Sequence, residues 1–317
     1  MAKFCIRIVP LTLLAFFGIS SCKNANLSAQ FLPQEVRQGP DYVDIVKLIE
    51  MRTETQRWAL RCGVSASKKN CDIGDAALFN GLLCLSGDEL SCEAVRRSQG
   101  SDGRMWRAEF RVASDAVNSF SRDMAMGVLA YLLATRDTEL ATRWMTWIES
   151  NGNRLCRESS DNRCNFTPGF WSLFREVWAH LGLPLNQQMR SAIVSDTVMA
   201  LLQSQFSPPG FELHLAAVNL LVRRSMDQKS TTLDSLAQAL AARQPDNPFF
   251  GYLKDGASGH VVRQALQWCP KTQPQTRVEW SFERNQQDKP WERSMGWECI
   301  MLANFLIRDL KADILNR

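Results

Sequence analysis

Apolar and polar positions alternate along the chain in a way that predicts two kinds of helix. From 120 to 133 the sequence is almost wholly apolar after one charged pair, Arg122 and Asp123. A helix that is apolar on every side is buried on every side, so this segment predicts an inner helix. The segment after Asp137 instead carries one apolar stripe, which predicts an outer helix with one wet face. The stripe consists of Leu140, Trp144, Trp147 and Ile148.

The same alternation occurs before and after this central hairpin. An apolar segment at 74–84 is followed by a turn at 86–89 and a second helix containing Ala94 and Val95. Further helices are predicted at 170–181, 191–202, 211–222, 233–242, 261–268 and 296–306. Of these, 211–222 and 296–306 are apolar nearly throughout and so are predicted to be inner helices.

These paired helices predict the fold class. Alternating apolar residues that would mark a strand occur only at 278–282. Hairpins of one inner and one outer helix predict an all-α fold with two concentric helical layers, an α/α toroid. No shift in composition divides the chain after residue 40, so 41–317 is expected to form a single domain.

The N-terminal segment predicts export. Lys3 and Arg7 precede an apolar run at 8–19 that is too short to span a bilayer, so 1–21 is interpreted as a signal peptide. The run from Ile19 to Cys22 resembles the lipobox of bacterial lipoproteins, which implies that Cys22 carries lipid, including palmitate. An ordinary signal peptide with a chance cysteine is the alternative.

The segment from 22 to 40 is rich in Asn, Ser, Gln and Pro and predicts a flexible tether between lipid and domain. Lys23 follows the lipobox cysteine. In the Gram-negative pattern an aspartate at that position retains a lipoprotein at the inner membrane, so the resemblance favours an outer-membrane location, on its periplasmic face or exposed beyond it.

The number of cysteines predicts disulfides, and the scattered histidines and modest net charge argue against a metal site and against nucleic acid as a partner. Cys5 lies in the signal peptide and Cys22 would carry lipid, which leaves eight of the ten cysteines, an even number that predicts disulfides in an exported protein. Nearest-neighbour spacing favours Cys62–Cys71, Cys84–Cys92, Cys156–Cys164 and Cys269–Cys299, among 105 possible pairings. The three histidines are scattered and no C-x-x-C or H-E-x-x-H occurs, so neither a metal nor a cofactor is expected. A net charge of +4 without a dense basic run argues against nucleic acid.

The starts of the inner helices carry acidic residues. Asp75 and Asp123 open successive inner helices, and Gly87–Asp88 and Arg136–Asp137 stand at the hairpin turns. This repeat resembles the six-hairpin (α/α) toroids of glycosidases and related sugar-processing enzymes, over about residues 41–310. The resemblance implies that the inner-helix starts line one open end of the barrel, where a carboxylate pair acts as general acid and base.

Cleavage of a glycosidic bond requires one protonated and one ionised carboxyl group. Asp75 and Asp123 are candidates because each is expected where a polar mouth meets an apolar wall, and Glu298 at the head of the last apolar helix is a third. Either aspartate could instead cap its helix.

Two loops combine tryptophan, arginine and acidic residues. Tryptophan faces stack on sugar rings, and arginine guanidinium groups hold the carboxylates or hydroxyls of the sugar. With Arg122, the candidate substrate-binding residues are Asp102, Arg104, Trp106, Arg107, Arg284, Trp291, Glu292 and Trp297. In the alternative, tryptophan and arginine stack on one another and stiffen the loops. The chain is therefore interpreted as a glycoside hydrolase-like or lyase-like lipoprotein acting on a glycan or peptidoglycan-like polymer. The second interpretation is a non-catalytic lipoprotein that binds a saccharide or a protein.

Overall fold

The computed structural model describes residues 40–59, 76–113, 120–157, 162–192, 196–206, 211–269 and 296–316. Within these ranges there is no β-strand, and the only β pairing is two isolated bridges, Gln99–Met105 and Arg154–Asn165. The predicted all-α class is therefore confirmed. The strand-like run at 278–282 lies outside the described residues.

The α-helices follow one another in hairpins. In chain order they are α1 (Pro40–Ala59), α2 (Ala76–Leu85), α3 (Glu89–Arg97), α4 (Arg122–Thr135), α5 (Thr138–Ser150), α6 (Pro168–His180), α7 (Gln187–Ser191), α8 (Asp196–Phe206), α9 (Phe211–Arg224), α10 (Thr231–Arg243), α11 (Pro248–Asp255), α12 (Gly259–Trp268) and α14 (Gly296–Asn316). Single 3-10 turns lie at Glu109–Arg111 and Asn162–Cys164.

Polar side chains fix where these helices begin. The carboxylate of Asp88 accepts a hydrogen bond from the backbone N–H of Ser91 (2.9 Å) at the start of α3. Asp137 does the same for the N–H of Leu140 (2.9 Å) at the start of α5. Each cap satisfies one of the backbone donors that a first helical turn leaves without a partner. The aspartates at both predicted hairpin turns are therefore N-caps.

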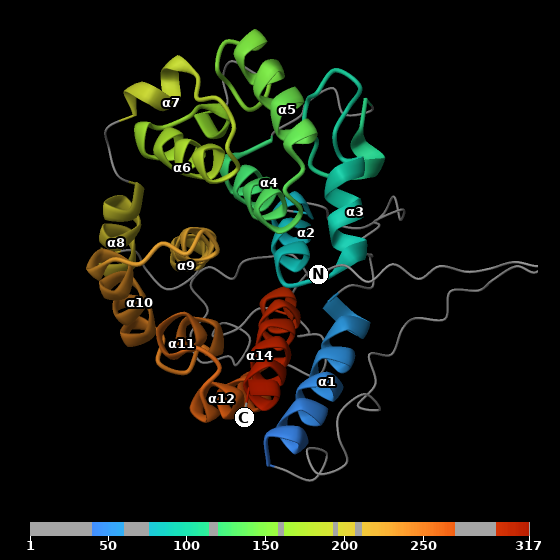
Figure 1. The fold of residues 1–317 in the computed structure, drawn as a ribbon, viewed down its shortest axis with the longest axis vertical. Coiled ribbons are helices and arrows are strands. Elements are labelled where there is room, and N and C mark those ends of the chain that lie inside the picture. The colour runs from blue at the N-terminus through green and yellow to red at the C-terminus, as the bar shows by residue number, and fades with distance from the viewer. Residues whose placement is uncertain are drawn as a thin grey trace, which may run out of the picture.

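The four helices predicted to be inner lie toward the middle of the molecule, with the amphipathic helices outside them (Figure 1). Helix α2 contacts α4 and α14, and α4 contacts α9. A buried side-chain pair then joins α9 to α14. The four inner helices thus border one another in a cycle. Two complete concentric layers, as in a toroid, remain a prediction.

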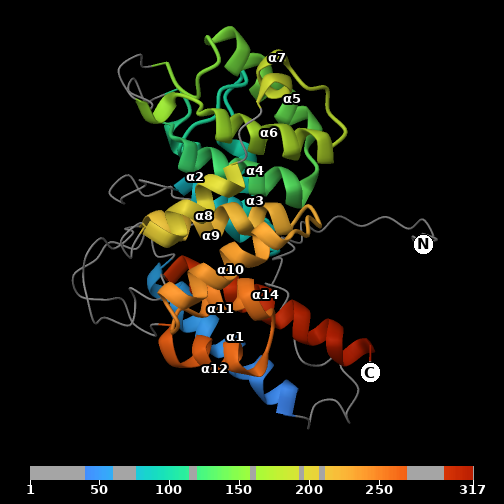
Figure 2. The same ribbon diagram turned by 90° about the vertical axis from the view of Figure 1, so that its left-hand side faces the viewer.

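Two large apolar clusters make up most of the core of the described residues. The larger surrounds Trp144 of α5, whose ring lies 5.2 Å from that of Phe174 and 6.3 Å from that of Trp178 on α6. The smaller joins α1, α12 and α14 through residues such as Leu48, Val261 and Leu302. Helices α1 and α14 lie side by side (Figures 1 and 2), so the two ends of the described chain pack together.

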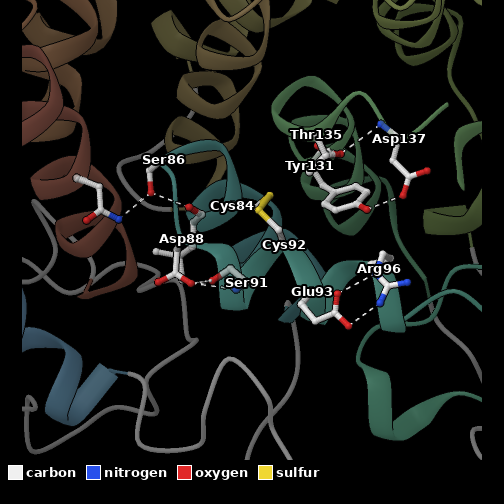
Figure 3. Close-up of a disulfide and its surroundings, with 12 residues drawn as sticks. Cys84, Ser86, Asp88, Ser91, Cys92, Glu93, Arg96, Tyr131, Thr135 and Asp137 are labelled. Carbon is white, nitrogen blue, oxygen red and sulfur yellow. Dashed lines mark hydrogen bonds and ion pairs between the residues drawn. A yellow bond between two sulfur atoms is a disulfide. The ribbon is translucent and has the colours of Figure 1, made fainter. Parts of the chain in front are cut away.

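Three of the four predicted disulfides are present. Cys84–Cys92 joins α2 to α3 (Figure 3), Cys156–Cys164 closes the loop before α6, and Cys269–Cys299 joins the end of α12 to the first turn of α14. The fourth, Cys62–Cys71, lies outside the described residues, as do Cys22 and the proposed signal and tether up to residue 39. No helix in the described ranges is both long and apolar enough to cross a membrane.

Polar contacts tie the first hairpin to the two ends of the chain. Ser86, at the α2–α3 turn, donates to the carbonyl of Leu83 (2.7 Å) and accepts from the side-chain amide of Asn304 on α14 (3.0 Å). The amide oxygen of Asn304 in turn accepts from Arg52 on α1 (2.9 Å). Figure 3 shows Ser86 beside the Cys84–Cys92 bridge. This chain of contacts holds α1, α2 and α14 in register.

Candidate functional site

The predicted catalytic carboxylates fall in different environments. Asp123 lies in the first turn of α4, behind the N-cap Ser121, and is partly exposed. Glu298 lies in the first turn of α14 and has 0% of its surface exposed. Asp75 lies outside the described residues. Helices α4 and α14 both contact α2. Asp123 and Glu298 therefore lie at the starts of two helices that share α2 as a neighbour.

Glu298 is paired with a histidine that the sequence did not single out. Its Oε1 atom contacts Nδ1 of His214 on α9, and His214 is only 2% exposed. The ring of Phe250 lies 5.3 Å from the imidazole, so the pair is enclosed by apolar surface. One signal was available in the sequence: His214 lies in the segment 211–222 that was predicted to be an inner helix, where the other ionisable residue is Glu212 in the first turn.

A carboxyl group and an imidazole in contact give each other a polar partner where water is excluded. When Nδ1 donates to the carboxylate, the pair also fixes the tautomer and orientation of the ring. These two side chains alone do not make a metal centre, and no group of three or more potential metal ligands occurs among the described residues.

The predicted substrate-binding loop at 102–107 faces largely inward. Arg104 and Trp106 are both buried, and the Arg104 guanidinium lies 4.1 Å from the centre of the Trp106 ring. It also lies 5.7 Å from the ring of Trp147 on α5. Asp102 accepts a hydrogen bond from the backbone N–H of Arg104 (3.0 Å), and Arg107 is partly exposed. The geometry favours the structural interpretation for Arg104 and Trp106, in which cation and ring stack on one another.

Side-chain hydrogen bonds also hold the loop in place. Arg143 on α5 donates to the carbonyl of Gly100 (2.8 Å), and Gln99 donates to the carbonyls of Gly103 (3.1 Å) and Leu140 (3.0 Å). Hydrogen bonds from side chains to loop carbonyls replace the contacts that a regular element would supply. These hydrogen bonds therefore fix the segment 98–107 against α5.

Arg122 has a similar positioning role. Its guanidinium donates to the carbonyls of Asn162 (2.9 Å) and Asn165 (2.8 Å), which flank Cys164. The start of α4 is thereby attached to the disulfide-closed loop before α6. Among the remaining candidates, Arg284, Trp291 and Glu292 lie outside the described residues, and so does the side chain of Trp297.

Comparison of the chain with protein-family models, with curated proteins and with solved structures finds no match. Two separate features are therefore the candidates, each for its own chemistry: the His214–Glu298 pair between α9 and α14, and the partly exposed Asp123 at the start of α4.

Proposed function

We propose that this protein is a lipid-anchored protein of the bacterial outer membrane that cleaves a glycan or peptidoglycan-like polymer. The proposal takes its compartment from the lipobox-like run ending at Cys22. It takes its chemistry from carboxylates at the starts of the inner helices. The chain uses no cofactor in this scheme, because acid–base cleavage of a glycosidic bond needs only carboxyl groups and water.

One observation carries the chemical part of the proposal. The His214–Glu298 pair is withdrawn from solvent between two inner helices. Burying two ionisable side chains is costly, and an apolar pair of similar volume is often as stable or more so. A role beyond stability accounts for this cost.

Asp123 and Glu298 differ in solvent exposure, and the proposal gives them different roles for that reason. Asp123 is partly exposed, so its carboxylate is the group that meets the substrate and exchanges a proton with it. Glu298 has no exposed surface and acts with His214 as a positioning pair behind the site. The scheme needs a second reacting carboxylate, and Asp75 is the candidate from the sequence; in glycosidases the two carboxyl groups are roughly 5 to 10 Å apart.

The test is a substrate screen with the purified mature protein. Peptidoglycan and a panel of polysaccharides are incubated with the protein, and products are followed by new reducing ends and by the ultraviolet absorbance of unsaturated sugars. Hydrolysis gives the first signal alone and β-elimination at a uronic acid gives both, whereas non-hydrolytic cleavage of peptidoglycan closes an anhydro ring, gives neither signal and is followed by release of soluble fragments. A folded protein that gives none of the three from any polymer would contradict the proposal. Labelling cells with palmitate tests the anchor separately, since Cys22→Ala should abolish the label.

A second candidate is a non-catalytic lipoprotein that binds another protein, and one feature favours it. Val198, Leu202 and Phe206 follow one another at four-residue spacing on α8 and are exposed, Phe206 by 78%. An apolar stripe in contact with water is typical of protein-binding surfaces. Under this candidate the substrate screen stays negative and Leu202→Lys weakens capture of the partner from envelope extracts without lowering the melting temperature.

A further inference from the structure

A second buried charge lies at the other end of α9 from His214. Arg223 is 1% exposed, and nine residues separate it from His214, which corresponds to about 14 Å along a helix. Its Nε donates to the amide oxygen of Asn219 (3.0 Å), and its Nη1 pairs with Oε2 of Glu176 on α6. Its Nη2 is also buried and has no acceptor in the part of the chain that the structure describes.

The carboxylate that faces Arg223 is already shared. Glu176 also accepts hydrogen bonds from the side-chain amide of Gln228 (3.1 Å) and from the hydroxyl of Ser172 (3.3 Å). That same hydroxyl accepts from Nη2 of Arg175 (3.2 Å), whose Nη1 donates to the carbonyl of Ala192 (2.5 Å). Glu176 therefore offers little further capacity to Nη2 of Arg223.

The cluster carries an excess of positive charge. Arg223 pairs with Glu176 directly and Arg175 is linked to it through Ser172, so among the described residues in these contacts two guanidinium groups share one carboxylate, an excess of one positive charge. Burial and the repulsion from Arg175 together lower the pKa of Arg223 to about 10, so the group is still charged at neutral pH. A water molecule could accept from Nη2 but would leave this excess charge in place. An anion both accepts the hydrogen bonds and neutralises the charge.

We propose that Arg223 and Arg175 form a binding subsite for the carboxylate group of a ligand. One carboxylate supplies the single negative charge that the cluster lacks, and a planar guanidinium matches its two oxygens. Arg175, Gln228 and Glu176 are partly exposed, and in this proposal the carboxylate group reaches Arg223 from their side of the cluster. The subsite does not depend on the proposed glycan cleavage, because it lies at the opposite end of α9 from His214.

Thermal unfolding in matched salts tests the subsite, with sodium acetate as the carboxylate probe and sodium chloride at equal ionic strength as its reference. Acetate that binds only the folded protein should raise the melting temperature by about 2 to 4 °C over chloride. Arg175→Gln should abolish this difference. Arg96→Gln is the matched control and should retain it, because Arg96 is exposed on α3 and paired with Glu93 (2.7 Å). Equal melting temperatures in the two salts, or an unchanged difference in Arg175→Gln, would overturn the proposal.

A second measurement needs no variant and covers the case in which Arg175→Gln does not fold. In wild-type protein labelled with ¹⁵N-arginine, a buried guanidinium gives N–H signals that exchange slowly with solvent. A slowly exchanging signal should shift on titration with acetate and stay in place with chloride. Slowly exchanging signals that ignore acetate would show an ordered water only and contradict the carboxylate subsite.

Discussion

Gly81 on α2 lies directly against Gly127 on α4. A Cβ atom added at Gly81 would overlap the carbonyl group of Gly127, and one added at Gly127 would overlap the backbone of Ala77 and Leu78. The two inner helices therefore cross backbone to backbone, closer than any pair of side chains would permit. This crossing sets the position of the first turn of α4, and with it Asp123.

Gly127→Ala should accordingly destabilise the protein. Overpacking in a filled core costs about 1 to 3 kcal/mol or more, because one of the two rigid backbones must shift. Urea unfolding measures this loss. Gly259→Ala is the control, since its added Cβ meets nothing nearer than Arg263 Nη1 at 3.5 Å and alanine favours helix by about 1 kcal/mol. Similar stability of the two variants would show that α2 and α4 do not cross at these glycines.

Trp106→Ala should lower the free energy of unfolding by about 3 to 5 kcal/mol, the usual cost of removing a buried tryptophan. The reason is its burial against Arg104. Arg157→Gln, at an exposed side chain 3.7 Å from Asp102, should change stability by less than about 0.5 kcal/mol. A Trp106→Ala protein of normal stability that has lost saccharide binding would restore the substrate-binding role predicted from the sequence.

The sequence predicted the elements of this fold better than its tertiary contacts. Helices that are apolar all round, such as 120–133, have only one stable environment, so their inner position follows from composition alone. Cysteine pairs eight residues apart, such as Cys84 and Cys92, are held close by their short loop. Both inferences are local, and both are confirmed.

Long-range partners leave no such local signal. His214 and Glu298 are 84 residues apart, and the sequence around each residue does not indicate that the other is its partner. The direction of a loop side chain leaves no local signal either: the sequence around Arg104 and Trp106 fits a sugar site and an internal stack equally well, and the position of Arg104 near the Trp147 ring favours the internal stack. The sequence therefore pointed to the carboxyl group of Glu298 but not to the histidine that contacts it, and a catalytic role for Glu298 stays a prediction.

Substitutions at His214 and Glu298 should show strong coupling. His214→Leu or Glu298→Leu alone leaves one ionisable group buried without its partner, which costs about 3 to 5 kcal/mol. The double variant removes both groups, so it should recover most of that loss. Urea unfolding of the four proteins closes the cycle. Losses that simply add would contradict a direct pair. A double variant that is stable but has no activity would show that the His214–Glu298 pair serves function and not stability.

Alkaline pH should destabilise the protein through two tyrosines. Tyr131 donates to Asp137 (2.7 Å) and Tyr252 to Asp309 (2.9 Å), and burial first, then the aspartate, raises the pKa of each phenol. A raised folded pKa gives stability that is complete below the unfolded value of about 10 and is lost as pH rises toward the folded value. Melting temperatures measured across this range should fall, and less so in Tyr131→Phe. An identical fall in that variant would remove Tyr131 as a source.

The central claim is that the carboxylate of Asp123 takes part in glycan cleavage, and turnover of Asp123→Asn measured beside its melting curve tests it most directly. The substitution keeps the size of the side chain and removes its acid–base function, so turnover on the active polymer should fall at least about 10²-fold while the melting temperature stays unchanged. Glu139→Gln, an exposed carboxylate at the equivalent first turn of α5, should keep full turnover. An Asp123→Asn protein that is as stable and as active as wild type would contradict the account.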